Sequence, residues 1–85
     1  RATGADATPD GRRLAVLTYD AIWVFESATP GGDDWFAGAV WWLPFSNAAG
    51  AESVGWADAD TLVVGATERD GHLYTVSMDQ LHRVR

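Results

Sequence analysis

The chain has no cysteine, no lysine and a single methionine among its 85 residues. The lack of cysteine excludes disulfides, thiolate zinc sites and cysteine nucleophiles. Because lysine is absent, six arginines face twelve acidic residues, which gives a formal net charge of −6. An acidic chain without a clustered basic face repels a phosphate backbone, so nucleic acid is not expected as a partner.

Long apolar runs are absent too. No segment approaches the roughly 20 apolar residues of a membrane-spanning helix, so no transmembrane segment is expected. The first eleven residues lack the apolar region of a signal peptide. Arginine instead of methionine at position 1 favours a processed chain or an excerpt of a longer protein.

The residues that are present fit a folded domain. Hydrophobic residues make up 47% and charged residues 21%, which is ordinary globular usage. A chain of this length buries only about 60 to 65% of its unfolded surface, so its core is marginal. Five tryptophans are more aromatic side chains than such a small core is expected to enclose. They predict burial against something outside the chain.

One segment occurs twice. Residues 8–17, Thr-Pro-Asp-Gly-Arg-Arg-Leu-Ala-Val-Leu, recur in weaker form at 56–65 as Trp-Ala-Asp-Ala-Asp-Thr-Leu-Val-Val-Gly, a constant offset of 48. A repeat of about 40 to 50 residues, built from turns and short strands, is typical of a β-propeller with one blade per repeat.

Each copy predicts a series of strands. The expected ranges are 3–8, 14–19, 22–25 and 40–45 in the first copy and 52–57, 61–67 and 72–76 in the second. The run 14–19 is apolar on both faces, which predicts a strand that is covered on both sides. Pro44 removes a ladder donor, so the strand 40–45 is expected to be outermost.

Turn chemistry separates these strands. Pro9 presets φ and Gly11 supplies a positive φ, so the Pro9-Asp10-Gly11 segment predicts a tight turn. Residues 77–80, Ser-Met-Asp-Gln, have the form of a capping box. The tail to Arg85 is therefore expected to open either a helical turn or a fourth strand.

Residues 8–15 and 21–25 carry a resemblance. This Thr-Pro-Asp-Gly turn, followed by an apolar strand and a short second strand, resembles the WD40-like, TolB-type β-propeller repeat. Residues 3–78 are similar to the last blades of bacterial six-bladed, esterase-like or phytase-like propellers, through Gly4-Ala5-Asp6, Asp33-Asp34-Trp35-Phe36 and Glu52. The resemblance implies an extracytoplasmic location, periplasmic or secreted. The second copy departs from the repeat, because Ala57-Asp58-Ala59-Asp60 replaces Pro-Asp-Gly.

The predicted fold is all-β, with two four-stranded antiparallel propeller blades of which the second is incomplete or ragged. Residues 1–46 form the first blade, 47–51 a linker and 52–85 the second blade. A propeller has about four to eight blades. The expected partners are therefore the remaining blades, from the same parent chain or from self-association, and three copies would give six blades.

Three carboxylates are the candidate metal ligands. Asp6 and Glu52 lie on first strands, and Glu68 follows the second strand of the second copy. Carboxylates converging from several blades would hold Ca²⁺, which takes about six to eight oxygens. The alternative is that they bind turn amides or solvent. Asp33-Asp34 and Asp58-Ala59-Asp60 lack the EF-hand pattern and are interpreted as turn residues.

No nucleophilic triad is predicted. The candidate serines are Ser27, Ser46, Ser53 and Ser77, and the candidate bases are His72 and His82. None of these serines has the Gly-x-Ser-x-Gly spacing, and both histidines are expected at the surface. The pair Arg12-Arg13 is interpreted as solvated.

Aromatic residues suggest a ligand surface. Trp35, Phe36, Trp41 and Trp42 lie within eight positions. Trp35, Phe36 and Trp41 are the candidate ligand-binding residues, because exposed tryptophan beside carboxylates can stack on a sugar ring. The alternative is packing between blades, since Trp41 and Trp42 point to opposite faces of one strand.

The leading hypothesis is a non-catalytic β-propeller segment that binds a protein or small-molecule ligand or serves as a scaffold. One alternative is a fragment of a metal-dependent propeller hydrolase, lactonase-like or phosphoesterase-like, with Asp6 and Glu52 in a channel site. The other is a lectin-like propeller that binds carbohydrate.

Overall fold

The computed structural model describes residues 2–29, 34–45, 51–66 and 73–85. The first repeat forms β1 (Ala2–Ala7), β2 (Arg13–Thr18), β3 (Ala21–Glu26) and β4 (Val40–Pro44). The second forms β5 (Ala51–Asp58), β6 (Thr61–Ala66) and β7 (Leu73–Ser77), and the tail forms the 3₁₀ turn η2 (Met78–Gln80) and β8 (His82–Arg83). All seven predicted strands are confirmed, with ends within one residue of the predicted ones inside the described ranges.

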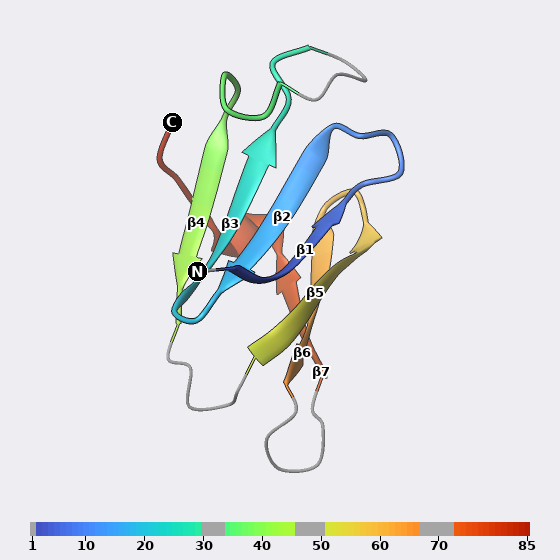
Figure 1. Ribbon diagram of the computed structural model, residues 1–85, viewed down its shortest axis with the longest axis vertical. Coiled ribbons are helices and arrows are strands. Elements are labelled where there is room, and N and C mark those ends of the chain that lie inside the picture. The colour runs from blue at the N-terminus through green and yellow to red at the C-terminus, as the bar shows by residue number, and fades with distance from the viewer. Residues whose placement is uncertain (1, 30–33, 46–50, 67–72) are drawn as a thin grey trace.

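These strands make two antiparallel sheets (Figure 1). The first has the order β1-β2-β3-β4-β8 and the second the order β5-β6-β7, and β1 lies against β5 between them. The predicted all-β class is confirmed. The strands divide as five and three rather than four and four, and within the described residues neither sheet closes on itself.

The predicted turn joins β1 to β2. The backbone nitrogen of Gly11 donates to the Thr8 carbonyl oxygen at 2.8 Å, and Gly11 has a φ of 73°. That positive φ confirms why glycine stands here, because a side chain would strain the backbone. The nitrogen of Thr8 donates to the carbonyl oxygen of Arg13 at 2.8 Å, which starts the ladder.

The two copies of the repeat also share one side-chain hydrogen bond. Asp10 Oδ1 accepts from the backbone nitrogen of Arg12 at 2.9 Å, and Asp58 Oδ1 accepts from that of Asp60 at 2.8 Å. Donors and acceptors are both 48 positions apart. The predicted turn at 58–60 is thus confirmed, and it has the side-chain bond that aspartate makes two residues on.

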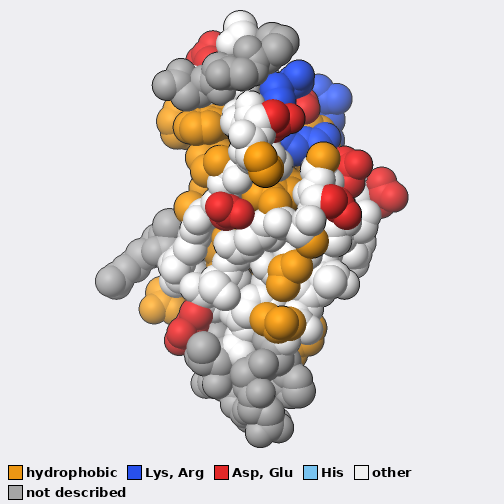
Figure 2. Space-filling model, turned by 90° about the vertical axis from the view of Figure 1, so that its right-hand side faces the viewer, with side chains coloured by type: hydrophobic (Ala, Val, Ile, Leu, Met, Phe, Trp, Pro, Cys, Tyr) orange, Lys and Arg blue, Asp and Glu red, His pale blue; other side chains and the backbone are white. Residues whose placement is uncertain are grey.

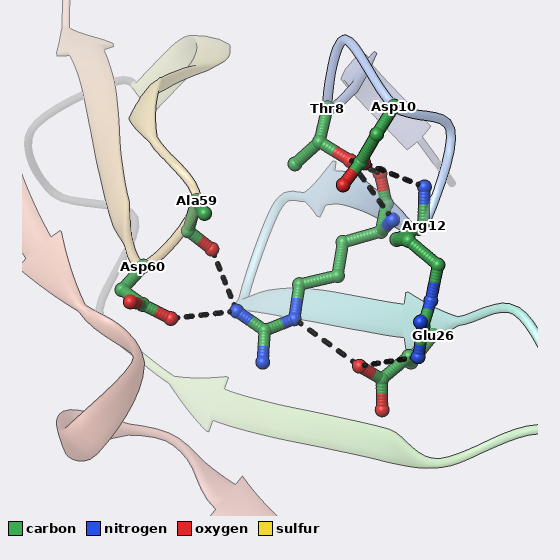
Figure 3. A pocket seen from close by; sticks show the side chains of 7 residues that line it. Thr8, Asp10, Arg12, Glu26, Ala59 and Asp60 are labelled. Atoms are coloured by element: carbon green, nitrogen blue, oxygen red, sulfur yellow. Dashed lines mark hydrogen bonds and ion pairs between the residues drawn. The ribbon is translucent and has the colours of Figure 1, made fainter. Parts of the chain in front are cut away.

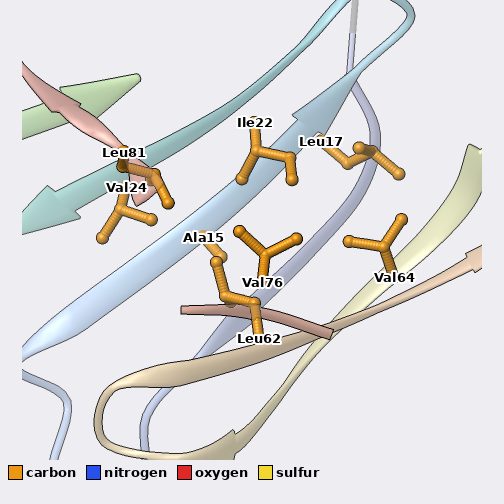
Figure 4. Packing of buried hydrophobic residues seen from close by; sticks show 8 residues of the cluster. All are labelled: Ala15, Leu17, Ile22, Val24, Leu62, Val64, Val76 and Leu81. Carbon is orange, nitrogen blue, oxygen red and sulfur yellow. The ribbon is translucent and has the colours of Figure 1, made fainter. Parts of the chain in front are cut away.

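The core lies between the inner faces of the two sheets (Figure 4). It contains Ala15, Leu17, Ile22, Val24, Leu62, Val64, Val76 and Leu81. In β2 the residues alternate, because Ala15 and Leu17 point inward and are fully buried whereas Leu14 and Val16 point outward and are half-buried. The prediction that this strand is covered on both sides is met in part, because among the described residues only its inner face is fully covered.

The tail corrects one prediction. Strand β4 is not outermost, because β8 pairs along its far side through Trp41 with Arg83 and Trp42 with His82. Val40 bonds to the tail through both its nitrogen and its oxygen. Pro44 lies four residues after Val40, so its backbone nitrogen faces the same side of β4, toward the tail. β8 does not extend as far as Pro44, and the missing N–H of proline therefore removes no bond between these two strands.

Both predicted forms of the tail are present in succession. The Ser77 nitrogen donates to Gln80 Oε1 at 2.9 Å and the Asp79 nitrogen donates to Ser77 Oγ at 3.3 Å, which completes the predicted capping box. A strand follows this 3₁₀ turn. That strand, β8, belongs to the first sheet rather than to the second.

Candidate functional site

An ion network crosses from one sheet to the other (Figure 3). Arg13 Nη1 donates to the carbonyl oxygen of Ala59 at 2.6 Å and to Asp60 Oδ1 at 2.9 Å, and its Nε lies 3.7 Å from Glu26 Oε1. The Arg13 side chain is only 20% exposed, whereas that of Arg12 is 41% exposed. The prediction of a solvated arginine pair is therefore wrong for Arg13.

Residues at the two repeated turns form this network. Arg13 pairs with Glu26 across β2 and β3 on the inner face, in line with the buried Ala15. The turn after β5 presents Asp60 opposite them. Between the two repeated turns lies an open hollow of about 250 Å³, and its lining residues are Thr8, Asp10, Arg12, Arg13, Glu26, Ala59 and Asp60.

Trp41 contacts the arginine at the centre of this network. The guanidinium carbons of Arg13 and Arg83 lie 5.5 Å and 5.6 Å from its ring centre. Such contacts are attractive because the face of an aromatic ring is electron-rich. Trp41 also packs against the core, so one ring connects the apolar interior to the charged end of the molecule.

Both turn aspartates are held in the charged form. The hydroxyl of Thr8 donates to Asp10 at 2.7 Å and, together with the nitrogen of Arg12, lowers the pKa of Asp10 below its usual 3.8. The backbone nitrogen of Asp60, followed by the side chain of Thr61, lowers the pKa of Asp58 in the same way. Each turn is therefore stabilised by a carboxylate rather than by a carboxylic acid.

These pKa shifts predict acid sensitivity. A carboxyl with a depressed folded-state pKa contributes stability above its unfolded pKa and loses that stability as the pH falls through the folded value. We expect the unfolding temperature to drop as the pH falls below about 4, and that of the double variant Asp10→Asn, Asp58→Asn to drop less. Circular dichroism melts at several pH values measure both slopes, and equal slopes would contradict the prediction.

Two of the three predicted metal ligands lie in the described residues. Asp6 Oδ2 accepts from the backbone nitrogen of Trp56 at 3.1 Å, and the Asp6 carbonyl accepts from Trp56 Nε1 at 3.0 Å, so this residue ties β1 to β5. Glu52 is exposed on β5, and Glu68 lies outside the described residues. Within the described ranges no three acidic, histidine or cysteine side chains are grouped to hold a metal ion. A Ca²⁺ site remains a prediction.

The candidate nucleophiles have structural contacts where they are described. Ser27 is buried and donates to the carbonyl oxygen of Thr29 at 2.7 Å, and Ser77 caps η2. His82 is exposed on β8. Ser53 lies on β5 beside Gly65, and Ser46 and His72 fall outside the described ranges.

The candidate ligand-binding aromatics lie on different faces. Phe36 is 79% exposed and meets Phe25 edge to face, with ring centres 5.7 Å apart. Trp41 faces the core, while its neighbour Trp42 lies on the outer face, which confirms that the two point in opposite directions. Trp35 is half-buried beside Phe36. Trp41 therefore does not share a stacking surface with Phe36.

Large apolar side chains fill the outer face of the first sheet. They are Leu14 and Val16 of β2, Trp23 and Phe25 of β3, and Val40 and Trp42 of β4. Trp23 and Trp42 are cross-strand partners with ring centres 6.0 Å apart. All except Val40 are only half-buried.

The outer face of the second sheet has mostly small side chains. It is formed by Ser53, Gly55, Val63, Gly65, Leu73 and Thr75. A Cβ on Gly65 would overlap the Ser53 hydroxyl, so glycine is required for this close approach. Phe36 packs on Phe25 at one end of the first outer face, and the Asp6 carboxylate of β1 lies beside Gly55 on the second.

No helix in the described residues is long and apolar enough to cross a membrane. Comparison with protein-family models, with curated proteins and with solved structures finds no match to this chain.

Proposed function

We propose that this chain is a non-catalytic β-propeller segment that acts as a scaffold and binds further β-sheets. The internal repeat supports the proposal. Two copies of one turn, with the same aspartate bond to the backbone nitrogen two residues on, each lead into a strand that pairs back onto the strand before the turn. The two sheets then pack face to face, as successive blades do. An extracytoplasmic location is part of the proposal and rests on the resemblance to the TolB-type repeat.

The observation that carries the proposal is the half-buried aromatic face of the first sheet, centred on Trp23 and Trp42. Contiguous apolar surface of this kind marks interaction sites on soluble proteins. Each Å² removed from water contributes about 25 cal/mol, so covering two indole rings is a substantial driving force.

A second copy of the chain is the occupant that fits this face. The outer face of its second sheet has mostly small side chains, with the Ser53 hydroxyl over Gly65, so Ser53, Val63 and Thr75 are the side chains that would meet the large rings. The contact joins two different faces, so copies add head to tail and close a ring when the rotation fits. Three copies would supply six sheets.

Light scattering after size-exclusion chromatography tests this association. We expect a mass that is a multiple of 9.2 kDa for the natural chain and a mass of 9.2 kDa for Trp42→Glu, because a buried unpaired carboxylate is strongly unfavourable. Tyr19→Glu is the matched control, since Tyr19 is 54% exposed in the turn between β2 and β3. It should associate like the natural chain.

A folded natural chain that stays at 9.2 kDa at all concentrations would contradict the proposal. Circular dichroism on the same samples shows whether each variant is folded. No described contact favours the hydrolase hypothesis, because the Asp6 carboxylate already binds a backbone nitrogen. The lectin hypothesis is likewise without a described stacking surface that includes Trp41.

A further inference from the structure

Four arginines from distant parts of the sequence gather at one end of the first sheet. Arg12 and Arg13 come from the turn before β2 and the start of that strand, and Arg83 and Arg85 come from the tail. Figure 2 shows basic side chains gathered at one end of the molecule, on a face where acidic side chains are more widely spread. The pairing of β8 with β4 brings the tail arginines to this place.

A hollow of about 480 Å³ opens among them. Arg12, Arg83 and Arg85 line it, together with Ser27 and the backbone around Gly38. Glu26 is the one carboxylate side chain of this lining, and it already lies 3.7 Å from Arg13. Three guanidiniums thus lie around one carboxylate side chain, which is shared with Arg13, in a chain that is acidic overall.

The guanidiniums of the hollow have more N–H donors than their described contacts use. Each has five N–H groups in a planar fork. Arg12 makes one long contact, 3.5 Å to Glu26, and its Nε is buried with no partner among the described residues. Arg83 Nε donates to the main-chain oxygen of Arg85, the last residue of the sequence, at 3.1 Å, and Arg85 donates to the carbonyl oxygens of Gly38 and Phe36.

The partners of Arg85 are neutral backbone carbonyls, which orient its guanidinium but do not neutralise it, whereas Arg83 is held by the main-chain oxygen of Arg85. Arg83 is also held by its contact with the Trp41 ring. The two tail guanidiniums are therefore fixed at the hollow before any ligand arrives. Such preorganisation lowers the entropic cost of binding an anion.

We propose that this hollow binds a small oxyanion, a phosphate group or a dicarboxylate. The planar forks of arginine match the oxygens of carboxylate and phosphate in bidentate geometry. This proposal does not depend on the assembly of the chain into a propeller.

Titration at low ionic strength tests it, with inorganic phosphate and malonate as probes and chloride as the reference anion. We expect saturable chemical-shift changes of the backbone amides of Arg12, Gly38 and Arg83, with a Kd on the order of 1 mM. Tighter binding of phosphate or of malonate identifies which oxyanion the hollow prefers. Shifts that chloride reproduces at equal ionic strength would overturn the proposal.

Two variants test the assignment of the residues. Arg83→Gln and Arg12→Gln should each weaken binding by roughly fivefold to tenfold, because each removes charge-assisted hydrogen bonds that are partly exposed. Tyr19→Glu lowers the net charge by the same unit at the opposite end of β2 and should leave the affinity within about twofold. Equal weakening in all three variants would show a net-charge effect and would overturn the site.

The light-scattering measurement of association is independent of the anion titration. Monomeric Trp42→Glu should still bind phosphate or malonate, because Trp42 does not line the hollow. Loss of anion binding in Arg83→Gln with unchanged molecular mass supports the hollow. Loss of association in Trp42→Glu with unchanged anion affinity supports the scaffold proposal independently of the anion site.

Discussion

Replacement of Trp41 by alanine is expected to lower the free energy of unfolding by about 3 kcal/mol, which is the lower end of the range for a buried aromatic residue. The ring packs against the core and lies within 5.6 Å of two guanidiniums, so the substitution removes apolar burial and both cation–π contacts. A domain of this size has a total stability of about 4 to 13 kcal/mol. One side chain thus supplies a large part of the stability.

Urea unfolding followed by circular dichroism measures this loss, and Phe36→Ala is the matched control. Phe36 is 79% exposed and has one aromatic contact, so its removal should cost less than about 1 kcal/mol. If the two variants lose the same free energy, Trp41 does not connect the core to the charged end as the structure indicates.

Replacement of Arg13 by alanine is expected to cost about 2 kcal/mol, because bonds between charged partners are worth more than neutral ones. The side chain bonds to Ala59 and Asp60 of the second sheet and pairs with Glu26 of the first. Its loss leaves the two sheets joined at this end only by contacts that do not involve this guanidinium.

The adjacent arginine is the control for Arg13. Arg12→Ala removes the same chemical group from a half-exposed position with one 3.5 Å contact, and should cost less than about 0.5 kcal/mol. A double-mutant cycle of Arg13→Ala with Asp60→Ala should show a coupling of about 1 kcal/mol, since Asp60 is 76% exposed. Equal losses from the two arginine variants would contradict the bridging role.

Local sequence was enough to place the strands and turns. β-branched and aromatic runs marked β2, β3 and β6, the turn at Gly11 needed a positive φ, and the capping box at Ser77 formed as expected. Each of these features depends on residues within a few positions of one another. Such short-range preferences can be read from the sequence alone.

The tail strand could not be predicted in the same way. β8 has only two residues, and it pairs with Trp41 and Trp42, some forty positions earlier in the chain. Two residues carry no periodicity, so only tertiary contact decides their partner. The gathering of Arg83 and Arg85 beside Arg12 was missed for the same reason.

One signal for the candidate site was present and overlooked. Arg13 has the same parity as Ala15 and Leu17 in an alternating strand, so it had to share their buried face. A charged residue on that face needs a partner of opposite charge. By contrast, the binding of Asp6 to Trp56 depends on how β1 lies against β5, and that arrangement has no local signature.

The position of β8 has a consequence for how the molecule forms. The whole second sheet lies, along the chain, between the fourth and fifth strands of the first sheet. The first sheet is therefore finished only after the second repeat has been made and folded back. Contacts of such large sequence separation slow folding and make it cooperative. Neither repeat is then an autonomous folding unit, and local opening of one loosens the last-formed edge of the other.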